Sequence, residues 1–170
     1  MDRGVPVILR PEWQENSDKP CDTGTSIAEM AKEWPQFDWG AVDPLYPKKE
    51  GLYEFSKGGL TERGRVAKKW LMGREEKVIA VVSHSGFLRV GVSHSRYENA
   101  DFRIFEFEGE EGVELVEWEV TEKKGGGLGK SERGHFPMST TDYIPDSVVP
   151  RRDTGVGEVT DEKPSTSSSL

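Results

Sequence analysis

Residues 77–89 of the chain read Lys-Val-Ile-Ala-Val-Val-Ser-His-Ser-Gly-Phe-Leu-Arg, and the first half of this stretch is an apolar run rich in β-branched residues. A strand that is apolar on both faces is typical of a parallel sheet covered by helices on both sides. The run ends at His84, Ser85 and Gly86. Ligands of open parallel sheets bind at the carboxyl ends of the strands, so this turn is expected either to border a binding crevice for an anion such as phosphate or to hold His84 by a hydrogen bond within the strand-to-helix turn.

The segments on either side of this strand favour α/β architecture. Ser26 and Glu29 have capping-box spacing before a helix that Pro35 ends. In chain order, the expected elements around residues 77–83 are a strand over residues 5–9, a helix over residues 27–34, a surface insertion over residues 36–59, a helix from Leu60 or Thr61 to Leu71, and an edge hairpin of residues 101–108 and 113–120.

The composition divides the chain into two parts. In residues 121–170, 24 of 50 positions are Gly, Pro, Ser or Thr, which predicts a disordered tail. A partner-binding segment is the alternative interpretation of this tail, with residues 142–145 as its most apolar point. The foldable domain is therefore expected to span residues 1–120.

Charge and hydropathy exclude several classes of protein. The chain has 31 acidic and 23 basic residues, a net charge of −8 and no basic block, which argues against nucleic-acid binding. No stretch approaches the ~18 apolar residues of a membrane helix, and the first residues lack the layout of a signal peptide. With Cys21 as its one cysteine, the protein is expected to be cytoplasmic.

Four segments resemble motifs of one known family, in the same order along the chain. They are residues 13–24, with Trp-Gln-Glu followed by Pro-Cys-Asp-Thr-Gly; residues 62–71; residues 79–89; and residues 97–103, with Asn-Ala-Asp-Phe-Arg. Together they are similar to the histidine phosphatase superfamily, the phosphoglycerate-mutase-like proteins, in their fungal branch. The resemblance implies a three-layer α/β sandwich with a mostly parallel sheet and an edge hairpin.

The resemblance also implies roles for individual residues. His84 resembles the second histidine, which holds phosphoryl oxygens, and the Ser85 N–H is an expected phosphate donor. Glu15 resembles the carboxylic acid that protonates the leaving oxygen of a small phosphorylated metabolite. The family's reaction proceeds through a phosphohistidine and needs no metal or other cofactor, so none is expected here. Arg63 and Arg89 are expected on the surface or on helix faces.

The sequence departs from the family pattern at its start. No Arg-His-Gly, the motif of the nucleophilic histidine, occurs in the 170 residues, and only 12 residues precede Trp13. The expectation is a C-terminal portion of the family's domain that begins at the third strand. Without the neighbouring first strand, residues 78–83 would form an unpaired apolar edge, so the chain is expected to be marginally stable or to self-associate there.

The sequence leaves several functions open. The first is a histidine-type phosphomonoesterase, and the second is a non-catalytic remnant that binds a phosphorylated metabolite or a protein. A third, with His84 itself as the nucleophile, lacks the supporting arginines. A metal enzyme is disfavoured because Cys21, Asp22, His84 and His94 have no recognised ligand spacing. A Ser-His-Asp hydrolase is disfavoured because no Gly-x-Ser-x-Gly occurs.

Overall fold

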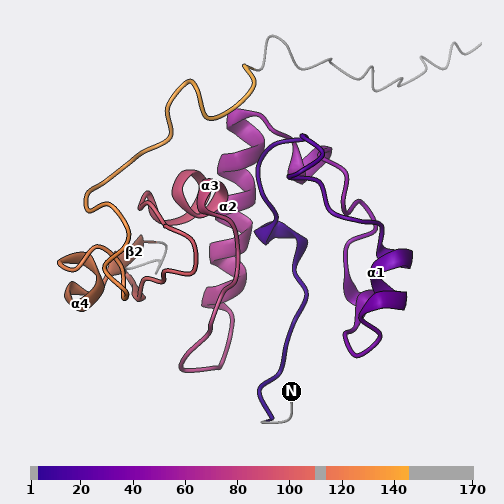
Figure 1. Ribbon diagram of the computed structural model, residues 1–170, viewed down its shortest axis with the longest axis horizontal. Helices are drawn as coiled ribbons and strands as arrows, with labels where there is room; N and C mark the ends of the chain where they lie inside the picture. The colour runs from indigo at the N-terminus through magenta and orange to yellow at the C-terminus, as the bar shows by residue number, and fades with distance from the viewer. Residues whose placement is uncertain (1–3, 110–113, 146–170) are drawn as a thin grey trace, which may run out of the picture.

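The computed structural model describes residues 4–109 and 114–145 of the chain. Most of its regular structure is helical, and a small sheet lies beside α4 (Figure 1). The elements are η1 (Pro11–Trp13), α1 (Ile27–Glu33), η2 (Trp39–Ala41), η3 (Gly51–Tyr53), α2 (Lys57–Met72), α3 (Ser85–Phe87), η4 (Leu88–Ser93), β1 (Phe105–Glu108), β2 (Glu114–Glu117) and α4 (Glu119–Glu122). No helix within the described ranges has the length and apolar character needed to cross a membrane.

Helix α1 confirms the predicted N-cap at Ser26. The Ser26 Oγ accepts a hydrogen bond from the Glu29 N–H at 3.4 Å and donates one to the Glu29 carboxylate at 2.5 Å. The helix ends at Glu33, before Pro35, as the sequence indicates. None of its residues is buried, so α1 lies at the periphery of the molecule (Figure 1).

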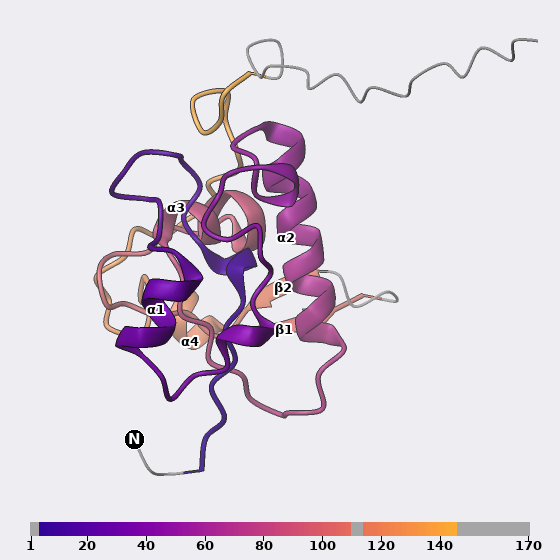
Figure 2. The ribbon, with the colours of Figure 1, turned by 90° about the vertical axis from the view of Figure 1, so that its right-hand side faces the viewer.

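Helix α2 is the centre of the fold. It begins at Lys57, three residues before the predicted start, because the Ser56 Oγ caps it by accepting a hydrogen bond from the Gly59 N–H at 3.1 Å. It passes close to η4 (Figure 2). The buried core on this side of the chain consists of Trp13, Leu60, Ala67, Phe87, Val90 and Val92. The hydrophobic contact between α2 and the helical turns after His84 therefore positions those turns.

Gly64 allows α2 and η4 to approach closely, and Gly91 leaves room for the Phe87 ring of α3. A Cβ atom at Gly64 would lie 1.9 Å from the Gly91 carbonyl oxygen, and a Cβ atom at Gly91 would lie 2.6 Å from the Phe87 ring. Both contacts are far shorter than any van der Waals contact. Only glycine therefore fits at this crossing without a shift of the backbone.

We expect Gly64→Ala to lower the free energy of unfolding by about 2 kcal/mol, because the added methyl group has to push α2 away from η4. Urea denaturation followed by circular dichroism measures this loss. Gly58→Ala is the matched control on the same helix, since a Cβ atom there meets nothing within 4 Å. The control should be slightly stabilising, as Ala is the better helix former. Equal stabilities of the two variants would contradict the close crossing.

The predicted mostly parallel sheet is not supported. Residues 77–83 are extended, but among the described residues no backbone hydrogen bond joins them to another segment. Val78 is 89% exposed and Val82 is 92% exposed. Residues 5–9 are likewise extended coil with exposed apolar side chains (Figure 1). A strand exists only with a hydrogen-bonded neighbour, so these two apolar runs remain unpaired extended segments.

The predicted edge hairpin is present in shortened form. Strands β1 and β2 pair antiparallel, with Phe105 opposite Glu117 and Phe107 opposite Leu115. Residues 110–113, which connect them, lie outside the described residues. Val120, predicted in the second strand, belongs to α4 instead. The mixture of helix and antiparallel sheet is consistent with an α/β class.

Part of the predicted tail packs against the rest of the chain. The Asp101 carboxylate accepts hydrogen bonds from the N–H groups of Leu128 and Lys130 and from the Ser131 N–H and hydroxyl. The Ile144 N–H donates to the Phe55 carbonyl at 3.0 Å. Residues 121–145 are thus held by specific contacts, and the remainder of the predicted tail, residues 146–170, lies outside the described residues.

Candidate functional site

His84 stands where the extended segment turns into helix. It is the residue before α3, and its carbonyl accepts a hydrogen bond from the Leu88 N–H at 3.0 Å. Its side chain is exposed, and no hydrogen bond or ion pair of the imidazole is found within the described part of the chain. The imidazole is therefore available to a ligand from solvent.

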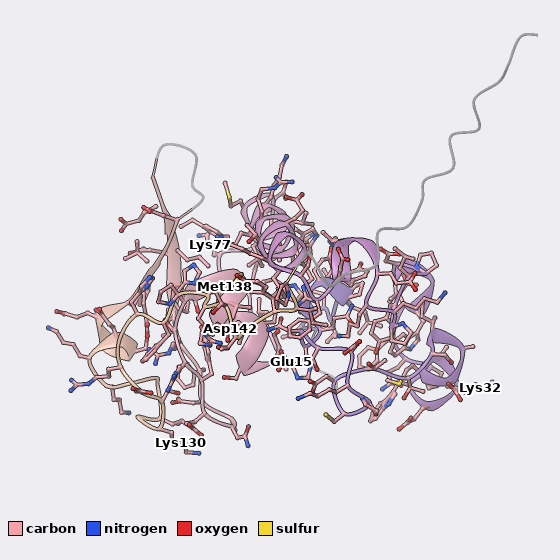
Figure 3. All side chains as sticks on the ribbon, turned by 90° about the horizontal axis from the view of Figure 1, so that it is seen from above. Glu15, Lys32, Lys77, Lys130, Met138 and Asp142 are labelled. Atoms are coloured by element: carbon pink, nitrogen blue, oxygen red, sulfur yellow. The ribbon has the colours of Figure 1, made fainter. Side chains whose placement is uncertain are left out.

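The Glu15 carboxylate lies against this same turn, although 69 residues separate it from His84 in sequence. Its Oε1 atom accepts hydrogen bonds from the Asn16 N–H at 2.8 Å and from the Phe87 N–H at 3.1 Å. A Cβ atom at Gly86 would lie only 2.5 Å from Oε1. The glycine thus makes room for the carboxylate, and the structure places Glu15, near the middle of the molecule (Figure 3), against the turn that follows His84 and Ser85.

Arg63 was expected on the surface or on a helix face; it lies in helix α2, but it is buried and not on the surface. The residue is 0% exposed, and its guanidinium lies 4.0 Å from the centre of the Phe87 ring. Its Nη2 donates to the Asn16 Oδ1 at 2.8 Å, and its Nη1 donates to the Glu15 carbonyl at 3.5 Å. A buried positive charge therefore stands directly behind the Glu15 segment.

A sequence signal for Arg63 does exist. It lies three residues after Leu60 and four before Ala67, which is the spacing of one helix face, and both neighbours are buried. Arginine is almost never fully buried unless it is paired, so an arginine on the apolar face of a helix calls for a buried partner. The apolar residues that predict this helix are Val66, Ala67, Trp70 and Leu71, and Arg63 precedes them on the same helix face.

Lys49 joins the site from the segment interpreted as a surface insertion. Its ammonium donates to the Glu15 carbonyl oxygen at 2.6 Å. Burial and the nearby Arg63 charge lower the pKa of Lys49 to about 8, and burial lowers the pKa of Arg63 to about 10. Two cations thus converge on one backbone carbonyl beside a carboxylate. Nothing in the periodicity of residues 36–59 indicates this role.

Residues 97–103, the last of the four segments that resemble the family, also lie beside the His84 turn. The Ser85 hydroxyl donates to the Tyr97 carbonyl at 2.8 Å, and the Tyr97 hydroxyl lies 2.9 Å from the Ser93 Oγ. Burial raises the pKa of Tyr97 to about 12. Arg103, whose side chain is 1% exposed, pairs with Glu117 of β2 at 2.8 Å. The Ser85 hydrogen bond thus ties the turn to residue Tyr97 of this motif.

Arg89 does not contribute to this group. It forms an ion pair with Asp142, and its Nη1 donates to Oδ2 of that carboxylate at 3.1 Å. The Arg89 hydrogen bonds hold the pKa of Asp142 at about 2. Arg89 therefore binds residues 139–145 to the body of the chain, and the positive charges of the candidate site are Arg63 and Lys49.

Three curated proteins are similar to this chain. A probable phosphatase of Schizosaccharomyces pombe is 33% identical over 91 residues, which cover 52% of this chain and 42% of the relative. A phosphoglycerate mutase-like protein of Arabidopsis thaliana is 38% identical over 77 residues, 42% of this chain and 27% of the relative. Phosphoglycerate mutase-like protein 1 of the same plant is 33% identical over 90 residues, 49% of this chain and 30% of the relative.

The names of these relatives support the superfamily that the sequence motifs resemble. The chain spans less than half the length of each of the three relatives. No family model matches it, and no solved structure matches it. The comparisons therefore show similarity to proteins named as a phosphatase and as phosphoglycerate mutase-like proteins, and they do not assign individual residues.

Proposed function

We propose that the chain binds the phosphoryl group of a small phosphorylated metabolite at the His84 turn, as part of a histidine-type phosphomonoesterase of the fungal branch. His84 and the Ser85 N–H hold phosphoryl oxygens in this proposal. Glu15 gives its proton to the oxygen of the departing alcohol. The observation that carries the proposal is the Glu15 carboxylate held against the N–H of Phe87, three residues after His84.

The chemistry of phosphoryl transfer supports this arrangement. The reaction needs positive charge around the equatorial oxygens and an acid close to the ester oxygen. Arg63 and Lys49 supply positive charge behind the Glu15 segment in a chain whose net charge is −8. Local cations are needed here because the overall charge repels an anionic substrate.

A specific observation favours a second candidate. The 170 residues contain no Arg-His-Gly, the motif that carries the nucleophile in the resembled family. The resemblance implies that in complete relatives this histidine attacks phosphorus. The ester oxygen then leaves with a proton from the carboxylic acid, and water later hydrolyses the phosphohistidine. A chain without that nucleophile is proposed to retain phosphate or protein binding without turnover.

Thermal unfolding and hydrolysis assays on the full 170-residue chain separate the candidates. With orthovanadate at ten times its dissociation constant, the melting temperature should rise by about 3 °C. His84→Ala should remove this rise, whereas His135→Ala, which changes an exposed histidine, should retain it. Gly86→Ala should weaken the rise as well, because the new methyl group displaces the Glu15 carboxylate.

Turnover of p-nitrophenyl phosphate by the chain, lost in His84→Ala, would establish the phosphomonoesterase. Vanadate-dependent stabilisation without turnover is the result we expect, and it would establish phosphate binding by a chain that lacks the nucleophile motif. If vanadate leaves the melting temperature unchanged and no hydrolysis is found, the proposal for His84 and Glu15 is wrong.

A further inference from the structure

A stripe of basic and hydroxyl side chains runs along one face of α2, away from the candidate site. Lys57, Thr61, Arg65 and Lys68 follow one another at intervals of four, four and three residues. Because an α-helix turns 3.6 residues at a time, these side chains share a face. Arg63 projects from roughly the opposite side of the helix, toward Glu15. The stripe therefore belongs to a different surface from the His84 turn.

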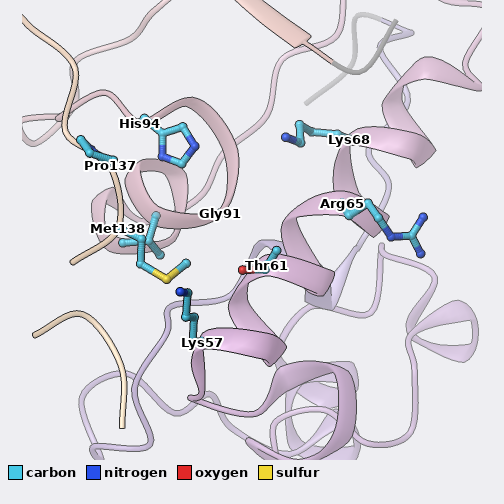
Figure 4. Close-up of a pocket in the computed structure, with 9 residues that line it drawn as sticks. Lys57, Thr61, Arg65, Lys68, Gly91, His94, Pro137 and Met138 are labelled. Atoms are coloured by element: carbon cyan, nitrogen blue, oxygen red, sulfur yellow. The ribbon is translucent and has the colours of Figure 1, made fainter. Parts of the chain in front are cut away.

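The stripe forms one wall of a pocket of about 450 Å³ (Figure 4). The other lining residues are Val90, Gly91, His94, Pro137 and Met138. No carboxylate lines this pocket, although acidic residues outnumber basic ones in the chain. A pocket of this volume, with cationic groups and an apolar floor, is of the size that small ligands occupy.

The cationic groups of the pocket lie at its two ends. The Lys57 ammonium approaches Met138 near Thr61, and the Lys68 ammonium points toward the His94 ring (Figure 4). Eleven residues separate the two lysines, which corresponds to roughly 16 Å of helix axis. A single phosphate is too small to contact both. The arrangement fits a ligand with an anionic group at each end.

The two lysines are free for such a ligand. Neither forms an ion pair with another of the described residues, whereas the guanidinium of Arg65, which also lines the pocket, pairs with Glu62 at 2.6 Å. The His94 Nδ1 atom is buried and has no hydrogen-bond partner within the described ranges. Unsatisfied polar atoms of this kind are rare in folded proteins and call for an explanation.

The backbone holds His94 rigidly in this position. His94 has a left-handed conformation, with φ of 55°, and its N–H donates to the Arg89 carbonyl at 3.0 Å. Its own carbonyl accepts a hydrogen bond from the Phe136 N–H at 2.7 Å, which places Pro137 and Met138 across the pocket. The pocket is therefore built from α2, η4 and the segment after Phe136.

We infer that this pocket is a second binding site, which takes a small molecule with two separated anionic groups on a short apolar body. Lys57 and Thr61 bind one phosphate or carboxylate group, and Lys68 and His94 bind the other. Val90, Gly91 and Met138 contact the apolar body between them. The site is independent of the proposed phosphatase site.

Isothermal titration of the full chain with 1,6-hexanediphosphonate and with hexylphosphonate tests this inference, because the two probes differ only in the second anionic group and neither is a phosphate ester. The diphosphonate should bind at least tenfold more tightly. Lys57→Met and Lys68→Met should each reduce its affinity to that of the monophosphonate. Lys69→Met is the matched control, since this exposed neighbour does not line the pocket.

His84→Ala should leave diphosphonate binding unchanged, so this site and the proposed phosphatase site can fail separately. Equal affinity of the two probes would overturn the inference, and so would equal effects of Lys68→Met and Lys69→Met. If the diphosphonate loses affinity in His84→Ala but not in the lysine variants, it binds at the other site and the inference is wrong. Each variant is first compared with the parent chain by circular dichroism.

Discussion

Arg63→Ala is expected to lower the free energy of unfolding by about 4 kcal/mol, because several losses coincide at one fully buried residue. The truncation leaves a cavity against the Phe87 ring, from which the guanidinium is 4.0 Å away. It also leaves the Asn16 Oδ1 without its donor in a buried position. Leaving a buried acceptor unpaired lowers the free energy of unfolding by more than the net amount that the lost hydrogen bond contributed to it.

The same substitution is expected to abolish the stabilisation by vanadate. Arg63 donates to the Glu15 carbonyl and, with Lys49, supplies the positive charge behind the proposed phosphoryl site. Urea denaturation with and without vanadate measures both effects on one variant. Arg63→Lys separates them, since a lysine keeps the charge but lacks the planar group that stacks on Phe87.

Arg65→Ala is the matched control for this prediction. It lies two residues away on the same helix, is exposed, and pairs with Glu62 on the surface. Surface ion pairs contribute little, so the control should change the free energy of unfolding by no more than about 0.5 kcal/mol. Similar losses for Arg63→Ala and Arg65→Ala would contradict the buried role of Arg63.

Local signals in the sequence predicted the helices and the hairpin, because they depend on nearby residues. Ser26 with Glu29 predicts the start of α1, and the apolar stripe of Val66, Ala67, Trp70 and Leu71 predicts α2. The parallel sheet could not be obtained in this way. A strand over residues 77–83 depends on a neighbour distant in sequence, and no such neighbour is found in the described ranges.

The candidate site was only partly predictable for a related reason. Glu15 and His84 were identified by resemblance, and the structure brings them to one turn. Lys49 reaches the Glu15 carbonyl from a segment without periodicity, so its contribution depends wholly on tertiary structure. The packing of residues 121–145 depends on Asp101 and Arg89, two charged residues whose partners in that segment no local pattern specifies.

The unpaired segment 77–83 leads to the second large effect, which is self-association of the chain. Alternate side chains of an extended segment point to opposite faces. Val81 packs against the core, whereas Val78 and Val82, on the other face, are about nine-tenths exposed. Burying each of these valines is worth about 1.5 kcal/mol or more, and their backbone groups form no backbone hydrogen bond with the rest of residues 4–109 and 114–145.

We expect Val78→Lys combined with Val82→Lys to weaken self-association at least tenfold, measured by analytical ultracentrifugation over a range of chain concentrations. The exposed positions should accept lysine with little change in the free energy of unfolding. Val120→Lys is the control, because Val120 is 63% exposed in α4, outside this segment. A parent chain that stays monomeric and melts cooperatively at high temperature would contradict the prediction. That result would mean that the unpaired edge neither drives association nor lowers the stability of the chain.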